Sequence, residues 1–290
     1  MKKITSIFLV AILYGCGSSV SPVDQGLIDQ VMHIGNGSEP QGLDPHIVTG
    51  VPEHHLLITM CEGLTTSNPE GGANLPGMAE SWEISEDGKI YIFNIRKDAK
   101  WSNGDDFVAD DMVWSWMRVL TPSLGSQYPD MLYYVEGAED FNTGVITDFS
   151  EVGVKAIDDK TLEVKLNNPT PFFLGLLSHY STWPVHKETV LEFGEIDDRQ
   201  VLWTRPGNFV CNGPMNLKSW ELNKKIIVEK NPLYWDADKV KLNQMHFYPV
   251  SDINTEERMF RAGQLHLTST VPSQKCGVWR EEGNPNLRID

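Results

Sequence analysis

The alternation of apolar and polar positions predicts two β-hairpins with a helix between them. Residues 82–95 carry apolar side chains at alternate positions on either side of an Asp-Gly turn, and residues 152–166 repeat this pattern. Between the hairpins, the apolar side chains of residues 110–120 recur about every 3.6 residues, which predicts a helix that ends before Pro122. Together these segments predict a small α+β unit.

The segments on either side of this unit predict an α/β lobe. Before it, residues 27–34 predict a strand, residues 36–55 have neither helical nor strand periodicity, and residues 54–64 predict a short helix. After it, the pattern predicts strands near 214–220, 226–228, 246–250 and 265–268 and a helix over 255–262. This alternation of strands and helices is typical of α/β architecture. Residues 276–290 predict the start of a further strand, so we expect the chain to be cut short, because an unpaired terminal strand is unfavourable.

The N-terminus has the composition of an export signal. Lys2 and Lys3 precede an apolar run that is too short for a stable membrane span, and Gly15 leads to Cys16. The residues before the cysteine are similar to the bacterial lipobox, in which the cysteine is acylated and becomes the new N-terminus. We therefore expect residues 1–15 to be a lipoprotein signal peptide, Cys16 to be lipidated and residues 16–26 to form a tether. An ordinary signal peptide with a chance cysteine is the alternative.

Composition and charge narrow the class of partner. Hydrophobic residues make up 40% of the 290-residue chain and charged residues 22%, which are the values of a folded globular protein. The formal net charge is −16, and it becomes −18 without residues 1–15. Such a charge repels nucleic acid and anionic membrane surfaces at long range, so we expect neither as a partner.

Three cysteines remain in the expected mature chain beyond Cys16. They are Cys61, Cys211 and Cys276, and none belongs to a CxxC motif. Export permits a disulfide, but an odd number cannot form a closed framework. Either one thiol stays buried and inert, or a partner cysteine is missing from this chain.

The aperiodic loop at residues 36–55 has three possible roles: a metal site, a ligand-binding loop or an idle connector. Its histidines His46, His54 and His55, together with Cys61 and Glu62, are the candidate metal ligands. The adjacent pair lacks the i, i+4 spacing that places two ligands on one helix face. We therefore expect surface histidines, no metal and no cofactor.

Catalytic motifs are also absent, because the sequence contains no GxSxG, Walker A, helix-opening GxGxxG or HExxH pattern. The paired acids Asp105-Asp106 and Asp110-Asp111 are explained by turn and helix-cap roles. We expect no enzyme. An extracellular hydrolase that uses Asp105, Asp106 or the histidines stays an alternative, and cleavage of an added peptide would support it.

Seven motifs, in order, resemble one family. They are NGSEPQGLDPH, EGL, PGMAESWEISEDG, FNIRKDAKWSNGDDFVADDMVWSW, VKAIDDKTLEVKL, NGPMNLKSW and NPLYWD. Taken together, they resemble the bacterial oligopeptide-binding proteins, the extracytoplasmic solute-binding components of peptide ABC transporters in the peptide/nickel class of solute-binding family 5.

The resemblance implies an α/β fold of two lobes that close over a peptide, of the class II periplasmic-binding-protein type with an extra subdomain. The implied parts are residues 27–61 and 184–275 for the first lobe, 62–183 for an inserted α+β subdomain and 276–290 for the truncated start of the second lobe. It also implies that most of the second lobe is missing, so we expect these 290 residues to bind peptide weakly or not at all. A disulfide of some members lies in the missing part, which is consistent with an unpaired Cys276.

Two stretches of the sequence match the family's peptide contacts. The segment Gly50-Val51-Pro52 corresponds to one that offers backbone groups to the ligand, and Tyr128 corresponds to a tyrosine that lines the cleft. Thr49 stands where well-studied members have a glutamate. Backbone groups of a loop suit this task, because neither a helix nor a sheet consumes them.

The implied function is that of an oligopeptide-binding component of an ABC importer, which delivers peptides to the permease subunits. We expect a monomer in the periplasm or on the outer face of the cytoplasmic membrane, held at the membrane by its N-terminal lipid. Within the family, the alternatives are a murein peptide, a dipeptide, nickel or haem as the solute. A short scaffold lipoprotein is a further alternative, and the reading frame beyond codon 290 tests it.

Overall fold

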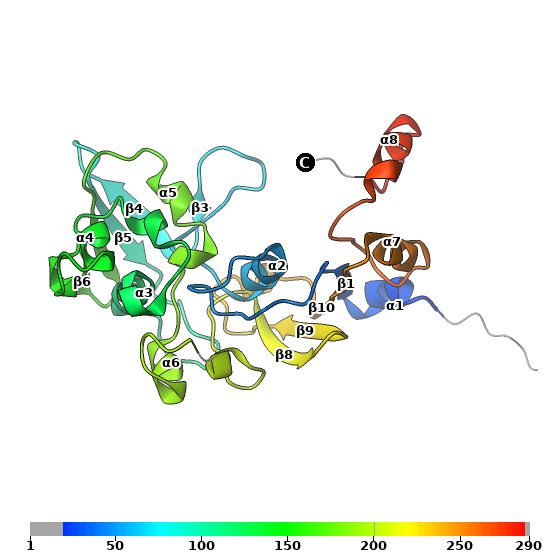
Figure 1. The fold of residues 1–290 in the computed structure, drawn as a ribbon, viewed down its shortest axis with the longest axis horizontal. Helices are drawn as coiled ribbons and strands as arrows, with labels where there is room; N and C mark the ends of the chain where they lie inside the picture. The colour runs from blue at the N-terminus through cyan, green and yellow to red at the C-terminus, as the bar shows by residue number, and fades with distance from the viewer. Residues whose placement is uncertain (1–19, 200, 288–290) are drawn as a thin grey trace, which may run out of the picture.

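The computed structural model describes residues 20–199 and 201–287, which are organised around two four-stranded sheets (Figure 1). The first sheet has the order β1 (Val31–Gly35), β10 (Gln244–Tyr248), β9 (Lys225–Lys230) and β8 (Met215–Glu221). Its β1 runs parallel to β10, and the other neighbours are antiparallel. The second sheet is antiparallel throughout and has the order β4 (Ala79–Ile84), β5 (Ile90–Ile95), β7 (Thr161–Lys165) and β6 (Val154–Asp158).

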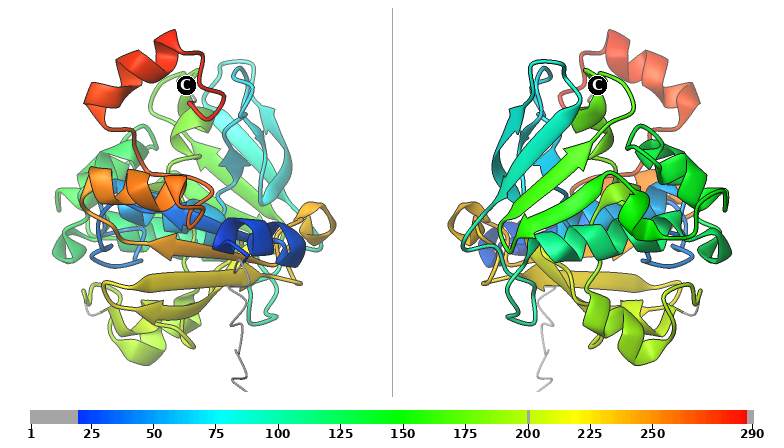
Figure 2. Two further views of the ribbon diagram at one scale, coloured as in Figure 1. Left: turned by 90° about the vertical axis from the view of Figure 1, so that its right-hand side faces the viewer. Right: turned by 90° about the vertical axis from the view of Figure 1, so that its left-hand side faces the viewer.

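The helices of the described residues lie around these two sheets. They are α1 (Pro22–Asp29), α2 (Val51–Met60), α3 (Ala109–Leu120), α4 (Ala138–Asn142), α5 (Phe173–Leu176), α6 (Lys187–Phe193), α7 (Ile253–Arg261) and α8 (Ser273–Glu281). Helices α3, α4 and α5 lie beside the second sheet, whereas α1 and α7 lie at the far end of the first sheet with α8 beyond them (Figures 1 and 2). A two-stranded pair is formed by β2 (Thr65–Thr66) and β3 (Leu75–Pro76). Within the described ranges, no helix combines the length and the apolar character needed to cross a membrane.

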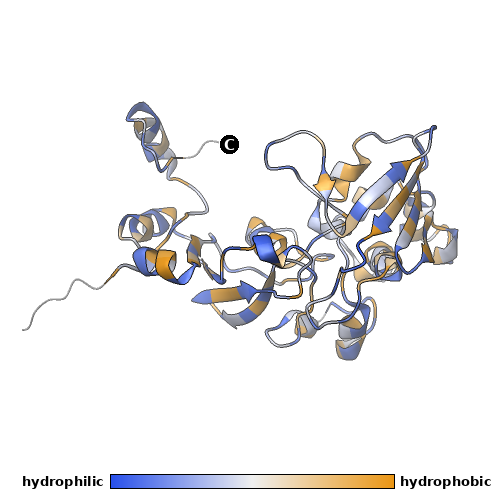
Figure 3. Cartoon of the chain, turned by 180° about the vertical axis from the view of Figure 1, so that it is seen from behind, coloured by the Kyte–Doolittle hydropathy of each residue, from blue (hydrophilic) through white to orange (hydrophobic). Residues whose placement is uncertain are grey.

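The second sheet confirms the two predicted hairpins and the helix between them. Buried and partly exposed positions alternate along β5, and hydrophobic and hydrophilic colours mix along this region (Figure 3). Phe93 of β5, Leu162 of β7 and Trp116 of α3 are fully buried in one core. The sequence predicts these strands because an antiparallel sheet with one covered face requires apolar and polar residues to alternate along each strand.

The first sheet confirms three of the predicted later strands and the helix near residue 255, which are β8, β9, β10 and α7. Helix α2 packs on this sheet, with Leu56 and Leu57 buried against Ile226 and Phe247. Buried apolar residues therefore form one core for each sheet, and a third cluster joins Trp114 of α3 to Val190 of α6 and Trp203.

The predicted strand over residues 27–34 is wrong in its first part. A helix, α1, runs from Pro22 to Asp29, and its first turn is capped by the Ser21 side chain, which accepts from the Asp24 N–H at 3.1 Å. Serine at the cap and proline in the first turn both favour a helix start. The predicted tether over residues 16–26 therefore ends in a helix. The predicted signal peptide and Cys16 lie outside the described residues.

The C-terminal prediction also needs correction. In place of a new strand near residue 276, the structure has α8, which follows Pro272 directly. Proline has the backbone angle of a helix start, and Gln, Lys, Arg and Glu are good helix formers. The strand predicted at residues 265–268 is reduced to a single bridge, in which Gly35 donates to the Leu267 carbonyl at 2.8 Å.

A disulfide pairs two of the three cysteines. Cys61, at the end of α2, is bonded to Cys211, with the two Cα atoms 5.3 Å apart and a sequence separation of 150. Both are buried in the core of the first sheet. In the part of the chain that the structure describes, the free thiol is Cys276, which is only partly buried.

Candidate ligand-binding site

The segment from Thr49 to Pro52 forms the start of a helix. Helix α2 begins at Val51, three residues earlier than predicted, and Gly50 is its N-cap. Thr49 and Val51 are exposed. The expectation of an irregular loop is therefore wrong at this point, because proline in the first turn favours helical backbone. The N–H groups of a first helical turn have no acceptor within the helix, so this end offers donors.

Hydrogen bonds with the preceding loop hold the helix start in place. Glu53 is buried and accepts from the Gln41 N–H at 2.6 Å. A Cβ atom at Gly50 would lie 1.9 Å from a carboxylate oxygen of Glu53, so a side chain at this position would displace that carboxylate. The Pro52 carbonyl accepts from the side chain of Asn36 at 3.1 Å, and the Gly50 carbonyl accepts from the His54 N–H. The carbonyls of Gly50 and Pro52 are therefore already used within the protein.

A buried ionic network anchors the chain just before the helix. Arg118 of α3 donates to both carboxylate oxygens of Asp44, at 2.9 and 2.6 Å, and contacts His46 Nδ1 at 3.0 Å. The other ring nitrogen of His46 lies 3.0 Å from the Trp183 carbonyl. These contacts make Nδ1 an acceptor and Nε2 a donor, which is the neutral ring. The prediction that His46 lies on the surface is wrong, because the ring is buried and bonded on both sides.

Electrostatics agree with this geometry. Burial and the nearby Arg118 charge lower the pKa of His46 to about 4. Burial alone would raise the pKa of Asp44, but the charge and hydrogen bonds of Arg118 outweigh it and leave this pKa below its usual value. The network therefore contains one ion pair and a neutral imidazole.

Tyr128 joins the same region through a cluster of rings. This imidazole–tyrosine cluster consists of His54, Tyr128, His179 and Tyr180. His179 stacks on Tyr180 with ring centroids 4.3 Å apart, and His54 lies 5.6 Å from the same tyrosine ring. The ring centroids of Tyr128 and Tyr180 are 6.3 Å apart.

The cluster contacts the chain next to Thr49, because the Tyr180 hydroxyl donates to the Val48 carbonyl at 3.2 Å. Burial, followed by the nearby Tyr128 hydroxyl, raises the pKa of Tyr180 to about 12. The structure thus brings Tyr128 to the predicted Thr49–Pro52 segment by way of Tyr180. Sequence reasoning missed His179 and Tyr180, although their apolar, proline-bounded surroundings marked a buried segment.

His54 and His55, the other two histidines of the predicted metal-ligand set, are not part of a metal centre. His55 is half-buried and bonded to Asn36 at 3.0 Å, and His54 is also half-buried, so neither is a freely exposed surface residue. Over residues 20–199 and 201–287, no group of three or more His, Cys, Asp or Glu side chains is arranged to hold a metal ion.

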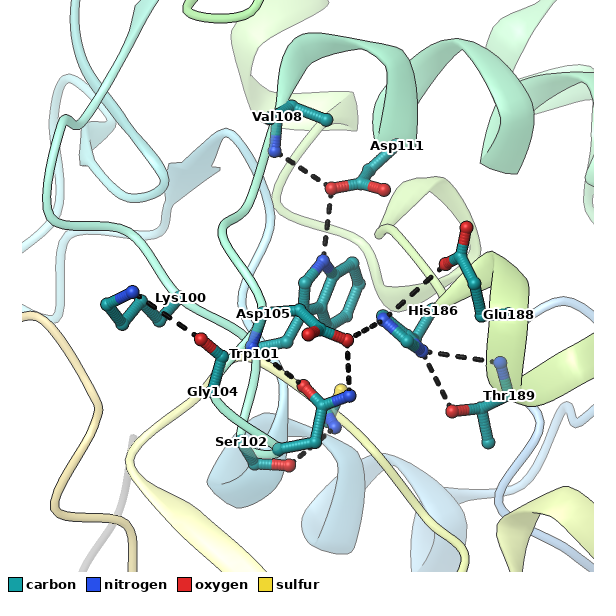
Figure 4. Close-up of polar contacts among 12 residues, drawn as sticks. Lys100, Trp101, Ser102, Gly104, Asp105, Val108, Asp111, His186, Glu188 and Thr189 are labelled. Atoms are coloured by element: carbon teal, nitrogen blue, oxygen red, sulfur yellow. Dashed lines mark hydrogen bonds and ion pairs between the residues drawn. The ribbon is translucent and has the colours of Figure 1, made fainter.

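The hydrolase alternative leads to the cluster in Figure 4, where an acid, a histidine and a hydroxyl lie in a row. Asp105 lies 3.1 Å from His186 Nε2, and Thr189 Oγ1 lies 2.8 Å from His186 Nδ1. However, His186 is the N-cap of α6, and its Nδ1 also accepts from the Thr189 N–H. Thr189 is buried, so a substrate could not approach its hydroxyl. A helix cap explains this arrangement fully.

Of the other acids, Asp111 has the helix-cap role predicted for it. Asp111 accepts from the Val108 N–H at 2.8 Å and from the indole of Trp101 at 3.0 Å. Asp106 is exposed and forms an ion pair with Lys100. None of these carboxylates lies in the imidazole–tyrosine cluster.

Comparison with known proteins decides the family. The family profile described as "Bacterial extracellular solute-binding proteins, family 5 Middle" matches residues 75–287. The chain belongs to this family. The periplasmic oligopeptide-binding protein OppA of Escherichia coli is 40% identical over 97% of this chain, and 36% identity links the chain to the oligopeptide-binding protein OppA of Bacillus subtilis over 98% of its length. The chain spans about half the length of these relatives, 51% and 53%.

Solved structures agree with this assignment. The structure of Haemophilus influenzae OppA in complex with the peptide RPPGFSPFR is similar to this chain with a TM-score of 0.82 at 37% identity. The match covers 89% of this chain and 49% of that one. The predicted family and the α/β fold class are thereby confirmed. The domain boundaries and the five predicted ligand-binding residues remain predictions.

Proposed function

We propose that this protein is the extracytoplasmic oligopeptide-binding component of an ABC importer. The main support is the meeting of two predicted peptide-contact regions, the start of α2 and Tyr128, in one cluster around Tyr180. Similarity to proteins named for oligopeptide binding supports the ligand class. The N–H donors of the first turn of α2 suit the carbonyl groups of a peptide main chain.

The other partners follow from this role. The permease subunits of the importer receive the peptide, and no chemical step on the ligand is required of this protein. Lipidation at Cys16 would hold the protein at a membrane in an extracytoplasmic compartment. Relatives named as periplasmic support that compartment.

Isothermal titration calorimetry with a mixed library of tri- to pentapeptides, on the complete gene product, tests the peptide-binding function. We expect micromolar or tighter binding, and absence of binding to every library member would contradict the proposal. Mass spectrometry of the ligand that co-purifies with the protein separates peptides from nickel complexes and haem. Retention of a non-peptide solute alone would replace the proposed ligand class.

A further inference from the structure

Two histidines of the cluster have a ring nitrogen that forms no hydrogen bond with any group of residues 20–199 or 201–287. His54 makes no side-chain hydrogen bond within the described ranges, and its Nδ1 is shut off from solvent while its Nε2 is not. His179 Nδ1 accepts from the Ser181 N–H at 3.3 Å, so the proton of the neutral ring lies on Nε2. His179 Nε2 also has no partner within these ranges and is open to solvent. Both rings contact Tyr180, so two available imidazole edges flank one phenol.

Few acidic side chains lie close enough to the rings of His54 and His179 to repel a bound anion. The titratable groups around the two rings are Glu53 and His55 on α2, Tyr180 beside His179, and Tyr128 and Asp130 on the segment that packs against them. Glu53 is buried with its carboxylate on the Gln41 N–H. Asp130 is exposed, and it is the one acid that raises the pKa of His179. Tyr180 is uncharged at neutral pH, because burial raises its pKa to about 12.

The resting state of the two rings is neutral. Burial lowers the pKa of His54, and the neighbouring His55 lowers it further. Burial also lowers the pKa of His179, with His54 as the next cause. A carboxylate placed beside either ring favours the charged form, so binding an acidic side chain would raise the pKa of the ring. A ring that gains its proton on binding makes the affinity rise as the pH falls.

We propose that His54 and His179 make this site selective for peptides that carry an acidic side chain, and that the selectivity strengthens as the pH falls. The inference rests on the proposed peptide-binding function and deepens it. The net charge of −16 repels acidic ligands at long range, so the preference depends on close contact with the rings.

The experiment compares the isosteric peptides Ala-Glu-Ala and Ala-Gln-Ala, with Ala-Lys-Ala as a third ligand. Their affinities for the complete gene product are measured by calorimetry at pH 7.5 and pH 5.5. Glutamate remains ionised over this range, because its pKa is about 4.3, and the peptide termini are the same in all three ligands. We expect the affinity ratio of the Glu peptide to the Gln peptide to rise about fivefold to tenfold at pH 5.5, since one coupled proton allows at most about tenfold per pH unit.

Variants assign the effect to the two rings. His54→Gln and His179→Gln should each reduce the rise of the Glu-to-Gln affinity ratio between pH 7.5 and pH 5.5, whatever their effect on the binding of the Gln peptide itself. His246→Gln is the matched control, because His246 is a half-buried histidine of β10 whose pKa is also lowered by burial, and it lies outside the cluster. It should leave the ratio unchanged. Thermal unfolding of each variant confirms that it is folded.

Proton uptake provides a readout on the unsubstituted protein. Titrations in buffers of different ionisation enthalpy should show more protons bound with the Glu peptide than with the Gln peptide at pH 5.5. Binding of all three peptides with a ratio that does not depend on pH, or a gain that survives both substitutions, would overturn this inference alone. Failure of all three peptides to bind at either pH would overturn the proposed function as well.

Discussion

The second sheet and the candidate ligand-binding site are held together by different forces. In the second sheet, apolar residues such as Phe93 and Trp116 meet in one core built mostly from hairpins and a neighbouring helix. At the site, buried polar groups hold the chain. Asp44 and Arg118 are 74 residues apart in sequence, and Glu53 is fixed against the backbone of Gln41.

This difference determines which amino-acid substitutions each region tolerates without losing stability. Apolar packing is non-directional, and cores accept other apolar side chains of similar volume. A buried hydrogen bond or ion pair requires its particular partner, and loss of one partner leaves the other group unsatisfied in a dry environment. The site is therefore expected to be the more sensitive region, and three experiments compare the regions.

The largest effect is expected from cutting the disulfide at the end of α2. In the chain-entropy account, a disulfide that closes a loop of 150 residues stabilises the protein by about 5 kcal/mol. The double variant Cys61→Ala, Cys211→Ala should lose about this much free energy of unfolding in urea denaturation. Cys276→Ser is the control, because this thiol is free, and its effect should stay within about 0.5 kcal/mol. Equal stability of the double variant and the control would refute the role given to the bond.

Removal of the buried cation tests the ionic network directly. Arg118→Met leaves the Asp44 carboxylate buried without a counter-charge, which should cost about 4 kcal/mol. Adding Asp44→Asn should restore about 2 kcal/mol, since the amide is uncharged and its oxygen can still accept from the His46 N–H. The measurement is again the free energy of unfolding of both variants. A double variant less stable than the single one would show that the uncompensated charge is not the cause.

The same contrast explains what the sequence could predict. Alternation and helical spacing located the hairpins of the second sheet, α3, and β8 to β10, because these elements bury one apolar face. They gave no warning of α1, whose start depends on the Ser21 cap and Pro22 more than on an apolar stripe. The helix start at Val51 was also missed, because Gly50 and Pro52 looked like loop residues.

The candidate site was predicted only in part, for a related reason. Thr49 to Pro52 and Tyr128 came from resemblance to a family, and the structure connects them through Tyr180, which has no distinctive motif. His46 was expected at the surface, yet its partner Arg118 lies 72 residues away. Pairing between distant polar residues leaves no period in the sequence, so patterns of hydrophobicity cannot reveal it.

The smallest loss of stability is expected from a substitution in the second sheet, which tests whether its apolar core tolerates a change of side chain. Phe93→Leu keeps an apolar side chain in a fully buried position of β5, and the neighbouring rings of Trp82 and Tyr91 can adjust to the smaller volume. The loss should be about 1 kcal/mol in urea unfolding, with peptide affinity unchanged. Ile92→Leu, on the partly exposed face of the same strand, is the matched control and should change stability by less than about 0.5 kcal/mol. A loss for Phe93→Leu as large as that of Arg118→Met would mean that the apolar core is as exacting as the polar site, and the proposed contrast between the two regions would then be wrong.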